Sequence, residues 1–182
     1  MAEQQKFTVK VSKQYNEETR LALGLEIVDF IIERSKAGKD KKNNDFASYS
    51  KSYMDSFDFK QSGKSKSKVD LTLSGEMLNA ITVLESNEGE ITIGIPEDDS
   101  FNNAKAEGNI KGTYGGTPKR GKKRDFMGIT SKDLAAIKAQ YPVKTKADKE
   151  SSLSKAQNLL ISTEASAGVA ESFLGKETLD GF

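Results

Sequence analysis

Residues 69–81 read VDLTLSGEMLNAI, and this stretch decides the fold that the sequence predicts. Apolar and polar residues alternate from Val69 to Leu73, which is the period of a strand with one buried face. The pattern then changes, because Ser74 is placed to cap a helix and Glu76 sets a negative charge at the positive end of that helix. The apolar residues of this helix form a short stripe, namely Met77, Leu78 and Ile81. We therefore expect a strand that passes directly into a short helix, as the rigid and non-catalytic centre of the chain.

Composition limits the chemistry that the chain can perform. The 182 residues include no cysteine and no histidine, which excludes a Ser-His-Asp triad, a Cys-His pair, a disulfide and a zinc site built on imidazole or thiolate. Carboxylate or lysine chemistry stays open, but no convincing constellation of carboxylates supports an enzyme. No apolar run is long enough to span a bilayer, and the N-terminus lacks a secretory signal. We expect no cofactor, no metal and no membrane contact, in a chain that stays in the compartment where it is made.

The segments before this stretch predict a strand and then a long helix. Apolar residues alternate in 7–11, as in a strand, and Asn16 can cap a helix over residues 17–35. The apolar side chains of this helix cover most of its surface, leaving one narrow acidic stripe. They are Leu21, Leu25, Ile27, Val28, Ile31 and Ile32, and the acidic stripe is Glu26, Asp29 and Glu33. So wide an apolar surface is expected to be covered by several elements, or partly by another subunit.

Residues 46–59 read FASYSKSYMDSFDF and carry aromatic side chains at spacings of three and four. This spacing predicts one short helix. Packing into the core is the favoured interpretation of its aromatic stripe, over a surface that binds a ligand or stacks on bases. The segments on either side, residues 37–45 and 60–68, are polar, rich in lysine and expected to be loops.

Two further signals follow the central stretch. Residues 82–84 and 91–95 are expected to pair as a hairpin through a turn at 86–89, and Pro96 ends the second strand. Thr130 and Asp133 form a capping box for a last helix, which ends near Tyr141. Together these signals predict an α+β fold, with a small antiparallel sheet packed on one long helix and two or three short helices, long basic loops and an extended C-terminal tail. We expect the body in residues 1–142 and the tail in residues 143–182.

Charge is divided into blocks of opposite sign. Residues 85–107 contain seven acidic residues and one lysine, whereas residues 111–124 contain six basic residues and no acidic one. On a chain of net charge +1, such blocks favour contact with other copies or partners over a general hold on nucleic acid. Glu97, Asp98 and Asp99 stand together. We favour an exposed acidic turn over a Mg²⁺ or Ca²⁺ site there, because the spacing does not match a calcium loop.

Residues 108–124 predict a long, glycine-rich basic loop whose glycines do not have the spacing of a phosphate-binding loop. With Tyr114 and Phe126, this loop could grip nucleic acid, or it could insert against an acidic neighbour. Residues 143–182 are rich in Ser, Ala, Lys and Glu and cannot build a core alone. A short helix is expected near residues 152–161. The rest is either an arm that orders on a partner or a free terminus.

Three stretches of the chain occur in the order of a known family and resemble it. Residues 34–53 match its basic loop followed by a Tyr-Ser-x-x-Tyr segment, residues 69–81 match its Leu-Thr-Leu core, and residues 119–134, which end in RDFMGITSKDL, match its C-terminal motif. The chain is similar to the phage virion-morphogenesis or tail-completion family, small proteins at the head–tail joint of tailed phages. The chain departs from the family in three places. The family often has a histidine before the glycine-rich loop, and this chain has none. Lys122 and Lys123 are inserted before Arg124, and the tail has no counterpart in the family.

The resemblance implies a structural virion protein that is not an enzyme. It implies a ring subunit, expected to be hexameric, at the neck or the top of the tail, needed to assemble the connector and to pass DNA. Its partners would be other copies of itself, portal-side neck proteins and tail-tube or tail-terminator proteins, while genomic DNA would pass through without sequence-specific binding. The protein would be made in the host cytoplasm and located in the virion. The alternatives are a tail-terminator or minor tail protein, and a small nucleic-acid-binding protein that uses the basic loop.

We expect subunit and partner contacts in three places, namely the basic loop with the residues after it, the acidic turn and the tail. The residues are Lys119, Arg120, Lys122, Lys123, Arg124, Asp125, Phe126, Glu97, Asp98, Asp99, Phe173, Leu174 and Phe182.

Overall fold

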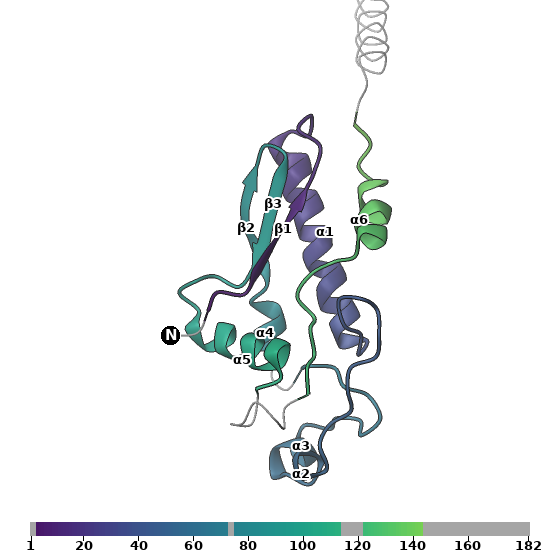
Figure 1. Ribbon diagram of the computed structural model, residues 1–182, viewed down its shortest axis with the longest axis vertical. Coiled ribbons are helices and arrows are strands. Elements are labelled where there is room, and N and C mark those ends of the chain that lie inside the picture. The colour runs from purple at the N-terminus through teal and green to yellow at the C-terminus, as the bar shows by residue number, and fades with distance from the viewer. Residues whose placement is uncertain (1–2, 73–74, 114–121, 144–182) are drawn as a thin grey trace, which may run out of the picture. The chain divides into compact units, whose positions relative to one another are not determined.

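Three antiparallel strands form the sheet in the part of the chain that the computed structural model describes, which is residues 3–72, 75–113 and 122–143 (Figure 1). The strands are β1 (Lys6–Lys10), β2 (Thr82–Asn87) and β3 (Glu90–Gly94), in the order β1-β3-β2. The predicted hairpin is confirmed, because β2 and β3 pair with Asn87 opposite Glu90. Thr8 lies opposite Thr92 in the other pair, and their hydroxyl oxygens are 3.0 Å apart. The α+β fold class is therefore confirmed.

The long helix α1 (Glu17–Lys36) packs on the sheet through β2 and β3. Its predicted cap is confirmed, since the Asn16 side chain accepts a hydrogen bond of 2.8 Å from the Thr19 N–H. Gly24 lets the helix approach closely, because a Cβ built there would lie 2.7 Å from a methyl group of Val83. The core between helix and sheet consists of fully buried aliphatic side chains, which supply most of the stabilisation. They are Leu23, Ile27, Ile31, Ile91, Ile93 and Ile95.

The predicted strand in residues 69–73 is wrong for the residues that the structure describes. Residues 69–72 form an irregular turn in which the Asp70 carboxylate accepts a hydrogen bond of 3.1 Å from the Thr72 N–H, and Leu71 has a left-handed φ of 56°. Such a side-chain bond to the backbone two residues on turns the chain and competes with a strand. Leu73 and Ser74 lie outside the described residues.

The short helix of the central stretch is confirmed as α4 (Glu76–Asn79), with Met77, Leu78 and Ile81 buried as expected. Its N-cap is Gly75, with a φ of 77° and no side-chain cap, so the prediction that Ser74 caps it is wrong. The glycine at this position allows a left-handed backbone that Ser would adopt at a cost. Among the described residues of this stretch, 69–72 therefore form a turn and Glu76–Asn79 a short helix.

Helix α5 (Ser100–Lys111) was not predicted. The Asp99 side chain caps it by accepting from the Asn102 N–H at 3.0 Å, and Gly112 ends it with a φ of 73°. Asn103, which is 1% exposed, donates to the Pro96 carbonyl at 2.7 Å and accepts from the Gln5 N–H at 2.8 Å. The loop predicted for residues 108–124 is therefore corrected, because residues 108–111 belong to this helix.

The single short helix predicted in residues 46–59 is two helices, α2 (Lys51–Met54) and α3 (Phe57–Gln61). Ser50 and Ser56 cap them separately, which is why the chain turns between them. The stripe predicted to pack in the core is Tyr49, Tyr53, Met54 and Phe57. Core packing is confirmed for Tyr49, whose buried ring lies 5.3 Å from that of buried Phe59. It is wrong for Phe57, which is 71% exposed.

The last helix is confirmed as α6 (Ser131–Lys138), with Thr130 accepting from the Asp133 N–H at 3.1 Å. It packs on α1, so the sheet and α6 both cover the long helix (Figure 1). Residues Met1–Pro142 form one compact unit. Within the described ranges, every helix is too short or too polar to cross a bilayer.

Candidate functional site

The two ends of the basic loop meet at one point of the body. The Arg124 N–H donates a hydrogen bond of 2.8 Å to the carbonyl of Asn109 in the last turn of α5. The Thr113 N–H closes that helix end by donating to the Gly108 carbonyl at 2.9 Å. Asn109 and Arg124 therefore lie side by side at the end of α5. Lys119 and Arg120 lie outside the described residues.

Arg124 and Asp125, which were expected to face partners, both have partners inside the body. The Arg124 guanidinium lies 5.4 Å from the Tyr49 ring centroid and donates from Nε to the Ala47 carbonyl at 3.3 Å. Burial lowers the pKa of Arg124, while the nearby Tyr49 and Tyr53 act in the opposite direction. The Asp125 carboxylate lies 2.7 Å from the Lys41 ammonium. These contacts attach the segment after the loop to the rest of the body.

Phe126 is fully buried, so the expectation that its ring contacts a partner or stacks on bases is wrong. Its carbonyl and that of Gly128 accept hydrogen bonds of 2.7 and 2.8 Å from one nitrogen of Arg34 in α1. Burial lowers the pKa of Arg34, and the charges of Asp133, Asp40 and Asp125 partly offset this effect. The resulting clamp holds residues 126–128 against α1. The motif that carries the family resemblance therefore has a structural role at Phe126.

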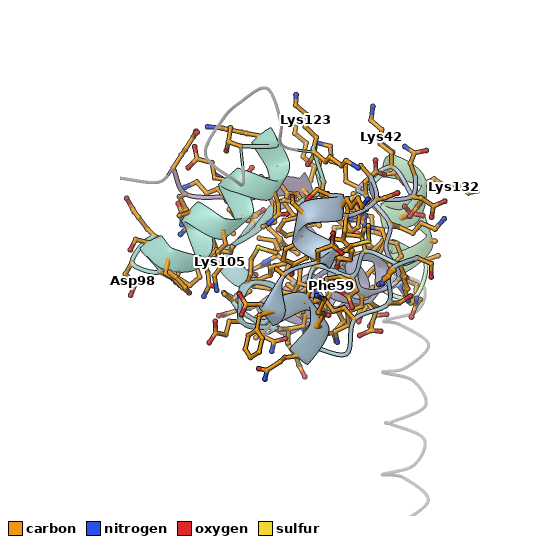
Figure 2. All side chains as sticks on the ribbon, turned by 90° about the horizontal axis from the view of Figure 1, so that it is seen from below. Lys42, Phe59, Asp98, Lys105, Lys123 and Lys132 are labelled. Atoms are coloured by element: carbon orange, nitrogen blue, oxygen red, sulfur yellow. The ribbon has the colours of Figure 1, made fainter. Side chains whose placement is uncertain are left out.

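Four exposed lysines lie in three segments of the chain that hydrogen bonds connect, and we call them the basic surface: Lys42, Lys122, Lys123 and Lys132. The Lys41 N–H donates to the Asp125 carbonyl at 2.8 Å, which joins the loop of Lys42 to the segment of Lys123. Asn43 donates to the Asp133 carboxylate at 3.0 Å, which joins the same loop to the first turn of α6 and Lys132. Figure 2 shows Lys123, Lys42 and Lys132 directed outward along one part of the outline.

No salt bridge joins the ammonium groups of the basic surface to another residue within the described ranges. The sequence analysis identified Lys122 and Lys123 but missed Lys42 and Lys132, which lie in other segments of the chain. The hydrogen bond between Asn43 and Asp133 shows that the segment of Lys42 meets the segment of Lys132 in the folded protein. The basic surface is thus a composite of three segments.

The predicted acidic turn lies at the other end of α5. Glu97 and Asp98 are exposed, whereas Asp99 is half-buried and caps the helix. Hydrogen bonds from the Asn102 side chain and N–H lower the pKa of Asp99. Among the described residues, no group of three acidic side chains could hold a metal ion. The twelve residues of α5 separate the acidic turn from the basic loop by about 17 Å.

One exposed aromatic ring extends the acidic turn. Phe101, in the first turn of α5, is 63% exposed, and the Lys105 ammonium lies 3.8 Å from its ring centroid. A large exposed ring beside charged groups is typical of a contact surface. Asp98 and Lys123 lie in different parts of the outline in Figure 2.

Helix α1 carries the third surface. Leu21 is 46% exposed and Leu25 is 49% exposed, and Ile32 on the same side of the helix is half-buried. We call these three residues the α1 stripe. The sheet and α6 pack on the other sides of the helix, so the expectation that several elements cover its apolar surface holds only for those sides.

The predicted tail contacts Phe173, Leu174 and Phe182 lie outside the described residues. Compared with family models, curated proteins and solved structures, the chain shows no match. The described body thus offers three candidate contact surfaces, which are the basic surface, the acidic turn with Phe101, and the α1 stripe.

Proposed function

We propose that the protein is a structural ring subunit at the head–tail joint of a tailed phage, acting in the neck or in tail completion. The observation that carries the proposal is the placement of opposite charges at the two ends of α5. Glu97 and Asp98 stand at its start, and the basic loop and basic surface adjoin its end. The location in the virion is proposed from the resemblance of residues 34–53, 69–81 and 119–134 to the tail-completion family.

Charge placed in this way supports contact of a head-to-tail kind. When the acidic turn of one copy meets the basic surface of the next, the first copy keeps a free basic surface and the second keeps a free acidic turn. Repetition of such a contact closes into a ring or continues as a filament. Opposite potentials also speed association and reject wrong partners. In the proposed assembly the ring lies between portal-side neck proteins and tail proteins, and genomic DNA passes through it.

Charge reversal tests this proposal. Lys122→Glu with Lys123→Glu should give heads and tails that fail to join, while the purified subunit keeps its circular dichroism spectrum. Arg124 is left unchanged, because its guanidinium contacts Tyr49 and Ala47. The matched control is Lys66→Glu with Lys68→Glu, two exposed lysines of another loop. Normal virions from the first variant would remove the proposal.

A charge swap identifies the contact itself. Glu97→Lys with Asp98→Lys should also block joining, and combining this pair with the two lysine reversals should restore it. Restoration is expected because the swap returns opposite charges to both sides of the same contact. A combined variant that joins no better than either parent would show that the acidic turn and the basic surface do not meet.

Nucleic-acid binding is the second candidate function, and the four exposed lysines of the basic surface favour it. The case for base stacking by aromatic rings is weaker, because Phe126 is buried and Tyr114 lies outside the described residues. Four phosphate contacts would reduce affinity roughly 100-fold between 50 and 200 mM salt. A gel-shift titration measures this slope, and the absence of binding at low salt would remove this candidate.

A further inference from the structure

Phe101, in the first turn of α5, is a large aromatic ring that remains in contact with solvent although a cation already lies over it. The ring is 63% exposed, and the Lys105 ammonium lies 3.8 Å from its centroid. The same ammonium lies 3.3 Å from the Glu76 carboxylate. Because Glu76 offsets the charge of Lys105, the other face of the ring can still attract a second cation. The exposed part of Phe101 is therefore suited to a partner that carries positive charge.

Acidic side chains precede this ring in the chain. Glu97 and Asp98 are exposed in the turn before α5, and Asp99 caps the helix. Figure 2 shows Asp98 and Lys105 in one part of the outline, away from Lys123. The phosphates of a nucleic acid would be repelled by these carboxylates, whereas a basic protein surface would be attracted. The charges around the ring thus favour a protein partner that presents lysine or arginine.

The basic surface supplies the chemistry that such a ring needs. Its four lysines are exposed, and none of them forms a salt bridge within the described residues. A lysine offers an ammonium for the face of the ring and an apolar stem for its edge. An aromatic ring that packs between such side chains excludes water from the charge pairs around it, which is the arrangement of an interface hot spot. A second copy of this chain therefore carries a fitting partner surface.

We propose that Phe101 is the anchor of the contact between the acidic turn of one copy and the basic surface of the next, where its ring packs between lysine side chains. The inference rests on the proposed function, because it specifies one residue of the proposed ring contact. Exposed charge pairs contribute little to affinity, whereas an aromatic anchor that becomes buried contributes much. Phe101 therefore determines how tightly two copies bind, and the surrounding charges determine which surfaces meet.

Two half-blocked variants isolate this contact in the full chain. The first carries Lys122→Ala with Lys123→Ala and keeps its acidic turn, and the second carries Glu97→Lys with Asp98→Lys and keeps its basic surface. The mixture should form a one-to-one complex, because only the turn of the first and the basic surface of the second still attract each other. Isothermal titration calorimetry measures the Kd of this complex. If no complex forms, the contact on which the proposed function rests is absent, and the inference fails with it.

Phe101→Ala in the first variant should raise the Kd of the complex at least about tenfold, as expected of a hot-spot residue. The same substitution in the second variant is the matched control, because the turn of that copy faces no partner, and it should change the Kd by less than about twofold. A complex that forms equally well with Phe101→Ala in the first variant would overturn the inference and leave the ring contact in place. Equal losses from both placements would show that Phe101 acts through the fold of the subunit, which also overturns it.

Two conservative substitutions in the first variant separate attraction by the ring from burial of apolar area. Phe101→Tyr keeps a ring face for the ammonium and should leave the Kd of the complex within about twofold. Phe101→Leu keeps a large apolar side chain without a ring face and should raise the Kd about fivefold or more. If the Leu variant binds as tightly as its Phe parent, the ring attracts no cation, and the proposed packing between lysine side chains is wrong.

Discussion

The backbone N–H of Arg124 donates a hydrogen bond of 2.8 Å to the carbonyl oxygen of Asn109. This bond joins the segment after the basic loop to the last turn of α5, so the loop begins and ends at a single point. Lys122 and Lys123, which precede Arg124 directly, are therefore held near that helix end. Backbone hydrogen bonds and the contact of Asn43 with Asp133 set the position of the basic surface, and its lysines form no salt bridge within the described residues.

Arg124 and Lys123 should respond differently to alanine substitution. We expect Arg124→Ala to lower the free energy of unfolding by about 1–3 kcal/mol, because it removes the contact with the Tyr49 ring and the hydrogen bond to Ala47. Lys123→Ala, at an exposed position, should change it by less than about 0.5 kcal/mol. Urea unfolding midpoints measure both. Equal midpoints for the two variants would contradict the structural role of Arg124.

Arg34 should be the most costly charged residue of α1 to replace. Arg34→Met leaves the carbonyls of Phe126 and Gly128 without their donor, and we expect a loss of about 2–4 kcal/mol. Lys36→Met is the control on the same helix, since its ion pair with Glu33 is exposed and contributes under about 1 kcal/mol. Thermal or urea unfolding distinguishes the two. A loss for Arg34→Met no larger than for Lys36→Met would refute the clamp.

The sequence predicted elements that local rules determine and missed those that tertiary contacts determine. Asn16 and Thr130 cap their helices as expected, because a cap acts within one turn. Residues 69–72 alternate like a strand, but the hydrogen bond from Thr72 to Asp70 turns the chain, and Lys64 binds the same carboxylate. The Thr72 bond is local, whereas the Tyr49 hydroxyl donates to the same carboxylate at 3.2 Å from 21 residues away, and no local pattern shows that contact.

Helix α5 escaped prediction because its residues are poor helix formers. Asn102, Asn103 and Gly108 lower its intrinsic propensity, and the contacts of Asn103 with Gln5 and Pro96 compensate. Two signals could have revealed it, Asp99 at the N-cap and Gly112 after the C-terminus. The basic surface also could not be predicted in full from the sequence. The charge blocks of residues 85–107 and 111–124 can be seen in the sequence, whereas Lys42 and Lys132 join the basic surface only through the folding of the chain.

Asp70 should make the folded state less stable in acid. Burial opposes its ionisation, but hydrogen bonds from Lys64 and Thr72 outweigh burial and lower the pKa of Asp70 from 3.8 to about 2. A lowered folded-state pKa gives stability that is present above pH 3.8 and lost as the pH falls to about 2. We expect this contribution to be about 1 kcal/mol, because part of the carboxylate remains in water and is screened.

Asp70→Asn isolates this effect, because Asn keeps an acceptor for Thr72 but has no charge for Lys64. The wild-type protein should be the more stable of the two at pH 5, and the difference should vanish near pH 2. Urea unfolding at several pH values measures it, with Asp55→Asn, at an exposed position, as the control. A difference between wild type and Asp70→Asn that persists at pH 2 would show that packing, not charge, connects Asp70 to the fold.

Gly24 and Val83 should be energetically coupled. A Cβ on residue 24 would lie 2.7 Å from one methyl group of Val83 and 3.2 Å from a methyl group of Ile91, so Gly24→Ala forces α1 away from the sheet. Overpacking of this kind costs about 1–3 kcal/mol, and the better helix propensity of Ala returns up to about 1 kcal/mol. We expect a net loss of about 1–2 kcal/mol for Gly24→Ala in the wild-type background.

Val83→Ala removes the methyl groups that the new Cβ would meet, so Gly24→Ala should be neutral or stabilising in that background. The coupling free energy from the four urea unfolding curves should therefore be about 1 kcal/mol or more. Additive losses would show that the strain lies elsewhere, with Ile91 as the next neighbour to examine.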